Sequence, residues 1–95
     1  MNANNLVSKV AILINLKKID IDEIVRWSSQ RNIEMLIFAA FKADHKIRLR
    51  SMNHLGRLSK QRQVRNALIE LMDDPILSIA IHASNVLQSH LLSRE

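Results

Sequence analysis

Two matching segments decide the fold: residues 33–58 (IEMLIFAAFKADHKIRLRSMNHLGRL) and residues 65–90 (RNALIELMDDPILSIAIHASNVLQSH). Shifting the first segment by 32 residues aligns five pairs of identical residues: Leu36 with Leu68, Ile37 with Ile69, Ile47 with Ile79, Asn53 with Asn85 and Leu55 with Leu87. Each segment has the pattern of an apolar helix, a tight polar turn and a second apolar helix. A repeat of this length is typical of stacked helical hairpins, which usually present a surface to a partner rather than enclose a reaction centre.

Composition narrows the class of fold. The chain has 95 residues, of which 47% are apolar and 24% are charged, so residues 1–95 are expected to form one folded domain. Leu, Ile, Ala and Arg are frequent, and there is one Gly and one Pro, which favours helix over strand. The absence of Cys excludes a disulfide and a thiolate-bound metal site. We therefore expect an all-α fold, a short right-handed α-solenoid of about six helices arranged as stacked hairpins.

Three helices are expected in the first half of the chain. The first spans residues 5–15, and the second begins after Asp20, with Glu23 placed to complete a capping box. Asn32 starts the third helix, which is apolar on most sides and is therefore expected to lie at the centre of the domain. Trp27 is expected to pack between the first and second hairpins. The inner stripe of the second helix is predicted to be Ile21, Ile24, Val25 and Ser28.

The second half repeats the plan. Asp44 is expected to cap the fourth helix and Ser59 the fifth, while Asp74-Pro75 starts the sixth with proline at its first position. Gly56 lies inside the fourth helix at a cost of about 1 kcal/mol relative to Ala, so we expect a neighbouring helix to approach closely there. The predicted inward residues are Ile47, Ser51, Leu55 and Leu58, then Val64, Ala67, Leu68, Leu71 and Met72, and finally Ile76, Ile79, Ala80, Ala83, Val86, Leu87 and Leu91.

These segments resemble HEAT repeats, a family of armadillo-type helical repeats. The resemblance rests on residues 47–58 and 67–87, with Ser51 and Ala83 at the small position of the inner helix and Leu55 and Leu87 at the large one. It covers residues 32–91 as about two clear repeats and residues 5–30 as a degenerate N-terminal hairpin. The resemblance implies that the second helices of successive hairpins line a concave side. It does not choose a ligand, because HEAT-like repeats bind proteins, peptides and nucleic acids alike.

The net charge of +5 is concentrated in one band. Residues 1–41 carry a net charge of +1 and residues 66–95 a net charge of −3. Residues 42–65 carry +7, because only Asp44 opposes eight basic side chains: Lys42, Lys46, Arg48, Arg50, Arg57, Lys60, Arg62 and Arg65. A band of this kind indicates binding to an acidic protein surface or to the phosphate backbone of a nucleic acid. Alternatively, it is a solvated helix face without a partner.

Helical spacing arranges part of this band into two matching polar stripes. On the fourth helix, one side opposite the apolar face carries Lys46, Arg50, Asn53 and Arg57. The positions 32 residues later, on the sixth helix, are Ser78, His82, Asn85 and Ser89. If the resemblance holds, both stripes lie on the concave side, and we predict that they bind a partner protein. The alternative is a nucleic-acid interface that uses Arg48, Arg50, Arg57, Lys60, Arg62 and Arg65 on phosphates, although the band lacks interleaved aromatic residues for base stacking.

Other functions find little support in the sequence. The four histidines, His45, His54, His82 and His90, lack metal-ligand spacing, and no Gly-rich phosphate loop or nucleophile motif is present. We predict no catalytic residue, no metal and no cofactor. No segment reads as an export signal or a membrane span, which favours a cytoplasmic protein, either a monomer or a homodimer. The predicted function is a non-catalytic adaptor or inhibitor, similar in style to bacterial immunity and antitoxin proteins, that binds an acidic partner.

Overall fold

The computed structural model describes residues 5–7, 9–10 and 18–92, apart from the side chain of residue 91. Its helices are α2 (Ile21–Ser29), α3 (Ile33–Lys42), α4 (His45–Gly56), α5 (Arg62–Leu71) and α6 (Leu77–Leu92). Residues 5–7 and 9–10 are also helical, and no strand occurs in these ranges. The all-α prediction is confirmed. Most of the helix expected over residues 5–15 lies outside the described residues.

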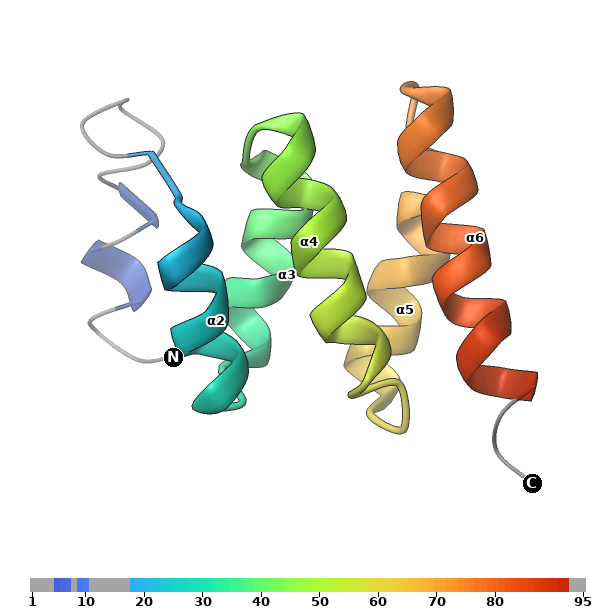
Figure 1. Cartoon of the computed structure of the whole chain (residues 1–95), viewed down its shortest axis with the longest axis horizontal. Coiled ribbons are helices and arrows are strands. Elements are labelled where there is room, and N and C mark those ends of the chain that lie inside the picture. The colour runs from blue at the N-terminus through green and yellow to red at the C-terminus, as the bar shows by residue number, and fades with distance from the viewer. Residues whose placement is uncertain (1–4, 8, 11–17, 93–95) are drawn as a thin grey trace.

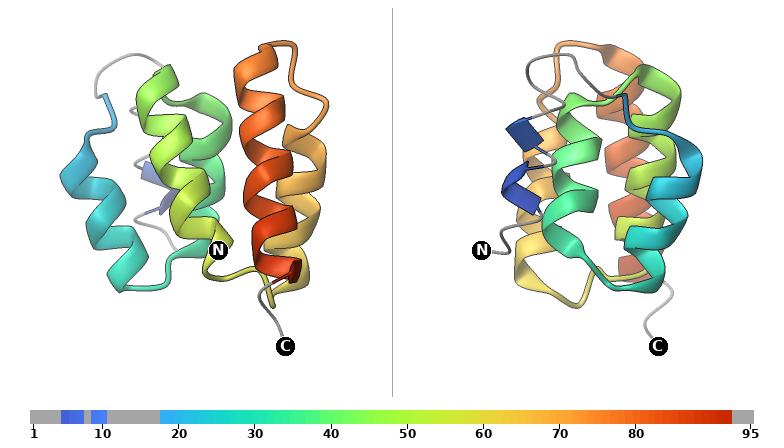
Figure 2. Two further views of the ribbon diagram at one scale, coloured as in Figure 1. Left: turned by 45° about the vertical axis from the view of Figure 1, so that its right-hand side comes forward. Right: turned by 90° about the vertical axis from the view of Figure 1, so that its left-hand side faces the viewer.

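The helices form two layers (Figures 1 and 2). In one layer α2, α4 and α6 lie side by side, and in the other α3 and α5 lie behind them. Helix α3 packs against α4, and α5 packs against α6, so consecutive helices form hairpins that follow one another along the long dimension of 41 Å. Helix α4 packs more extensively against α6 than α3 does against α5.

Two of the predicted helix starts are confirmed. Asp20 and Glu23 form the expected capping box, in which the Glu23 backbone N–H donates to Asp20 Oδ1 at 2.8 Å. In return, the Asp20 backbone N–H donates to Glu23 Oε1 at 3.3 Å. Asn32 precedes α3, and its Oδ1 accepts a hydrogen bond from the Met35 backbone N–H at 3.3 Å.

The other three starts differ from the prediction. Asp44 occupies the N-cap position of α4, but its side chain makes no capping hydrogen bond. Ser59 does not cap α5, because the chain makes another turn and the helix begins at Arg62. Helix α6 begins at Leu77, so Pro75 lies before the helix rather than at its first position. For α5 and α6 the prediction assumed the shortest turn, whereas the chain uses additional turn residues; α4 begins directly after Asp44 as predicted.

The core lies between the two layers, and α3 is central to it as predicted. Met35, Leu36, Ala39 and Ala40 of α3 are completely buried, and Trp27 is buried in the same cluster, which confirms its packing role. Several predicted inward residues are instead exposed: Ile21, Val25, Met72 and Ile76. On α2 the buried positions are Glu23, Ile24 and Trp27, so the inner stripe is rotated from the predicted one.

Gly56 marks the close approach that its position in a helix predicted. A Cβ atom built on Gly56 would lie 2.7 Å from Val86 Cγ1 and 2.9 Å from two atoms of the His90 ring. Both neighbours belong to α6. The missing side chain therefore lets α4 and α6 pack with little space between them, which positions the polar stripes of these helices next to each other.

Candidate functional site

The predicted stripe on α4 is solvent-exposed along its whole length. Lys46, Arg50, Asn53 and Arg57 are all exposed, whereas Ile47, Ser51 and Leu55 on the other side of the helix are buried; these four exposed residues are called the α4 stripe below. Three of its four members carry a positive charge. Successive turns of one rigid helix therefore present three cations and one amide to solvent.

The matching positions on α6 lie next to this stripe. Ser78, Asn85 and Ser89 are exposed and His82 is half-buried; these residues are called the α6 stripe. His82 Nε2 donates a hydrogen bond to Asn53 Oδ1 at 2.8 Å, and Ser78 Oγ lies 3.4 Å from His45 Nε2. The two stripes therefore form one continuous polar surface across α4 and α6, which the repeat spacing alone did not establish.

A shallow hollow of about 220 Å³ lies on this surface. It is lined by Asn53, Asn85, Val86, Ser89 and His90. The amides, the hydroxyl and the imidazole supply both hydrogen-bond donors and acceptors, and no carboxylate lines the hollow. A carboxylate or another polar group of a partner can therefore enter without meeting a negative charge.

Positive charge dominates the electrostatics beside the hollow. The pKa of His54 on α4 is lowered from its usual 6.5, first by desolvation and then by the charges of Arg57 and Arg50. His54 Nδ1 is buried without a hydrogen-bond partner among the described residues. The positive charges of Arg50 and Arg57 disfavour the protonated, cationic form of His54. The same positive charges attract an anion to this part of the surface.

Arg48 does not belong to the exposed basic surface, which corrects the nucleic-acid prediction. Its side chain is only 9% exposed, and its Nε donates a hydrogen bond to the Ala40 carbonyl oxygen at 2.7 Å. Its guanidinium also forms an ion pair with Asp74, in the turn between α5 and α6. The other Asp74 oxygen, Oδ1, accepts from the Ile76 backbone N–H at 2.9 Å, and both Arg48 and this bond lower the pKa of Asp74. Arg48 thus joins two hairpins and is unavailable to phosphates.

Arg65 is also engaged within the protein. Its Nη1 donates to the Ser59 carbonyl oxygen at 2.9 Å and to the Lys60 carbonyl oxygen at 2.7 Å, which holds the turn between α4 and α5. Lys60 and Arg62 in the same region are exposed. The exposed cations of the band are therefore the three basic residues of the α4 stripe (Lys46, Arg50 and Arg57), Lys60, Arg62, and Lys42 at the end of α3.

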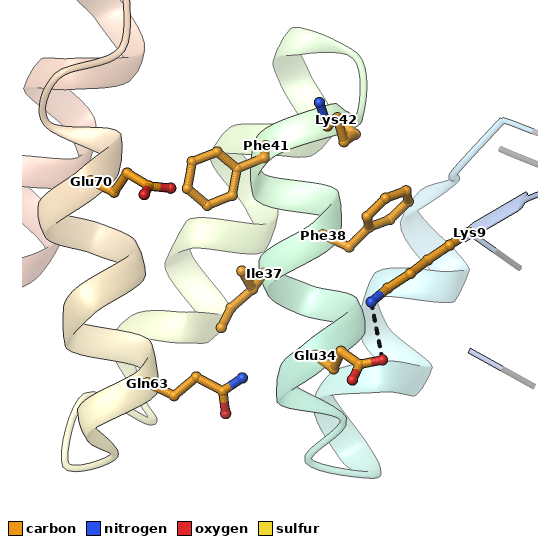
Figure 3. Close-up of a pocket in the computed structure, with 8 residues that line it drawn as sticks. All are labelled: Lys9, Glu34, Ile37, Phe38, Phe41, Lys42, Gln63 and Glu70. Atoms are coloured by element: carbon orange, nitrogen blue, oxygen red, sulfur yellow. Dashed lines mark hydrogen bonds and ion pairs between the residues drawn. The ribbon is translucent and has the colours of Figure 1, made fainter. Parts of the chain in front are cut away.

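A second hollow lies on the opposite layer and was missed by sequence reasoning (Figure 3). It has a volume of about 430 Å³, lies between α3 and α5, and is lined by Lys9, Glu34, Ile37, Phe38, Phe41, Lys42, Gln63 and Glu70. Lys9 Nζ lies 3.0 Å from Glu34 Oε1, an ion pair that lowers the pKa of Glu34, and it also lies 5.6 Å from the centre of the Phe38 ring. The sequence gives one indication of this hollow. Helix α3 is apolar on most of its sides, so the layer of α2, α4 and α6 cannot cover all of its apolar surface.

Among the described residues, no three His, Cys, Asp or Glu side chains gather closely enough to hold a metal ion. None of the helices in the same ranges is long and apolar enough to cross a membrane. No known family model matches the chain, and no curated protein or solved structure matches it at a significant level. The resemblance to HEAT repeats remains a prediction, and the function has to be argued from the surface itself.

Proposed function

We propose that the protein is a non-catalytic, HEAT-like binding module whose partner is a protein with an acidic surface. The observation that carries the proposal is the joining of the α4 stripe to the α6 stripe by the hydrogen bond between Asn53 and His82. This bond makes one surface out of two helices, and Lys46, Arg50 and Arg57 give it a positive charge. Rigid helices that hold charged groups at fixed spacing favour recognition of a complementary protein surface.

The proposed mode of action is occlusion, as in an adaptor or an inhibitor of the immunity or antitoxin type. Arg50 and Arg57 would pair with carboxylates of the partner, and the hollow between Asn53 and Ser89 would receive a polar side chain. Burial of Arg–carboxylate pairs at the centre of an interface gives orientation and specificity as well as affinity. The cytoplasm remains the proposed location.

Nucleic-acid binding is the alternative, supported by the exposure of Arg57, Lys60 and Arg62 around the end of α4. Two of the six residues expected to contact phosphates, Arg48 and Arg65, are held by protein groups instead. Four of the six, Arg50, Arg57, Lys60 and Arg62, remain exposed. The structure therefore supports protein binding better.

The test is a pull-down from the native host with the wild-type chain and with the double variant Arg50→Glu, Arg57→Glu. The expected result is one stoichiometric protein that the double variant fails to retain. A matched control is Lys18→Glu with Arg31→Glu, which makes the same change in net charge at exposed positions outside the basic band and away from both stripes. Equal retention by the double variant would contradict the proposal. Salt-sensitive binding to DNA or RNA, lost in the double variant but kept in the control, would favour the alternative.

A further inference from the structure

Helix α6 is the outermost helix at one end of the described array, and its outer side is uncovered and apolar (Figure 1). Leu77 is 71% exposed, Ile81 is 50% exposed and Leu92 is 72% exposed. At helical spacing they share one side with Ser84 and Gln88; this set is called the end face. Exposed large apolar side chains also occur close by in α5 and the following turn, at Ile69, Met72 and Ile76. Large apolar side chains exposed on neighbouring elements indicate an interaction surface.

The repeat shows that this side of α6 corresponds to a surface that receives a helix elsewhere in the chain. Subtracting 32 from Leu77 and Gln88 gives His45 and Gly56. On α4 these two residues face α6: His45 lies beside Ser78, and Gly56 lies against Val86. Ile69 of α5 corresponds in the same way to Ile37, which faces the gap between α3 and α5 (Figure 3). The C-terminal hairpin thus repeats the receiving side of the hairpin before it, and no helix within residues 18–92 covers that side.

We propose that a second copy of this chain covers the end face, by antiparallel packing of α6 on α6 about a two-fold axis. The order of residues on this face is nearly symmetric about its centre. An antiparallel pair places Leu77 opposite Leu92 of the second copy and Ile81 opposite Gln88, while the small Ser84 lies near the axis and permits close approach. A two-fold interface requires such self-complementarity, because the same patch is used twice.

Charge favours a second copy as the occupant, and the size of the end permits one. The two shorter dimensions of the molecule, 27 and 21 Å, set an upper limit of about 570 Å² on the end of each copy, or about 1,100 Å² for both copies, so a specific interface of roughly 1,000 Å² would use nearly the whole end. The end face itself carries no charged side chain, so two copies meet without repulsion at its centre. The α4 stripe, by contrast, would repel its own copy. The expected dimer is therefore weak and apolar, and it leaves the polar stripes free.

The oligomeric state of the full chain tests this proposal. Sedimentation velocity over a concentration series should show a monomer–dimer equilibrium for the wild type, with a dissociation constant at least tenfold higher for Leu77→Glu. Val25→Glu is the matched control, because Val25 is 50% exposed on α2 and the variant introduces the same charge. Circular dichroism confirms that each variant is folded. A wild-type monomer at every concentration up to about 1 mM would overturn the proposal, as would equal dimerisation by Leu77→Glu.

Cross-linking tests the two-fold geometry separately. The chain has no Cys, so Ser84→Cys introduces one thiol close to the proposed axis, and Ser29→Cys introduces one on α2. Mild oxidation should convert the first variant, and not the second, into a covalent dimer. Equal cross-linking of both variants, or growth of the wild type into species larger than a dimer, would contradict the two-fold arrangement. These outcomes are independent of the proposed partner binding, which depends on Arg50 and Arg57.

Discussion

Replacement of Gly56 by Ala should destabilise the protein, although the same change stabilises an ordinary helix interior. Ala is favoured over Gly in helix interiors by about 1 kcal/mol, and because Gly56 is the last residue of α4 this value is an upper limit here. Here the new Cβ would lie 2.7 Å from Val86 Cγ1, which is about 1 Å inside the optimal carbon–carbon separation. Val86 is buried and β-branched, so its side chain cannot easily rotate away. The His90 ring, at 2.9 Å, would also have to shift.

The balance of these terms gives the expected magnitude. Overpacking of a core costs about 1–3 kcal/mol in the free energy of unfolding. The higher helix propensity of Ala offsets at most about 1 kcal/mol of this cost. We expect a net loss of about 1 kcal/mol in the free energy of unfolding, or a fall in Tm of about 4–8 °C for a domain of this size. Urea denaturation followed by far-UV circular dichroism measures the first quantity, and thermal denaturation measures the second.

A double-variant cycle isolates the contact between Gly56 and Val86. Val86→Ala alone should destabilise the protein, because it removes buried methyl groups. In that background Gly56→Ala no longer meets Cγ1, so it should be neutral or stabilising, and the sign of its effect should reverse. The expected coupling is about 1–2 kcal/mol. If Gly56→Ala stabilises the wild type and the Val86→Ala background equally, α4 and α6 do not approach as closely as described, and the explanation for Gly56 is refuted.

Three further predictions concern the buried polar groups. Arg48→Met should cost about 3 kcal/mol in urea denaturation, because Asp74 is left in a largely buried position without its cation, and adding Asp74→Asn should recover part of this loss. Ser51→Ala should cost about 1 kcal/mol, since the buried Ser51 hydroxyl donates to the Leu36 carbonyl oxygen at 2.5 Å, whereas no measurable loss would argue against that bond. His54→Gln should flatten the dependence of Tm on pH between about 7 and 5. Because the folded state lowers the pKa of His54 below 6.5, the unfolded chain binds the proton more readily. The contribution of His54 to stability is therefore complete above pH 6.5 and is lost as the pH falls; an unchanged profile in the variant would contradict this assignment.

The repeat spacing predicted the features that depend only on helical periodicity. It identified the helices of the second half, the buried faces around Ser51, Leu55 and Ala83, and the close approach at Gly56. Periodicity succeeds here because a helix exposes or buries the same side at every turn. It also placed Asn53 and His82 on adjacent helices, although their hydrogen bond depends on a packing distance that no single helix encodes.

Turn lengths and long side chains escaped prediction for physical reasons. The residue type of Ser59 predicts a cap, but capping residues also occur in ordinary turns, and only the packing of α5 decides where that helix begins. The residue type of Arg48 predicts a surface cation. Its spacing to Met52 and Leu55, both buried, was the available signal that it lies on the inner side of α4. A buried arginine requires a buried partner, and Asp74 is 26 residues away in the sequence.

Helix α6 presents two surfaces with different chemistry, and this separation makes the two proposals independent. Ser78, Asn85 and Ser89 continue the polar surface of α4, whereas Leu77 and Ile81 lie on the side that faces away from α4. Since Arg50 lies on α4 and Leu77 on the end of the array, a charge reversal at one position leaves the other surface intact. Two copies joined through the end face would then present two polar surfaces to one or two acidic partners. Such a dimer would raise the effective concentration of the second site, so Leu77→Glu should weaken capture of a multivalent partner and leave capture of a monovalent one unchanged.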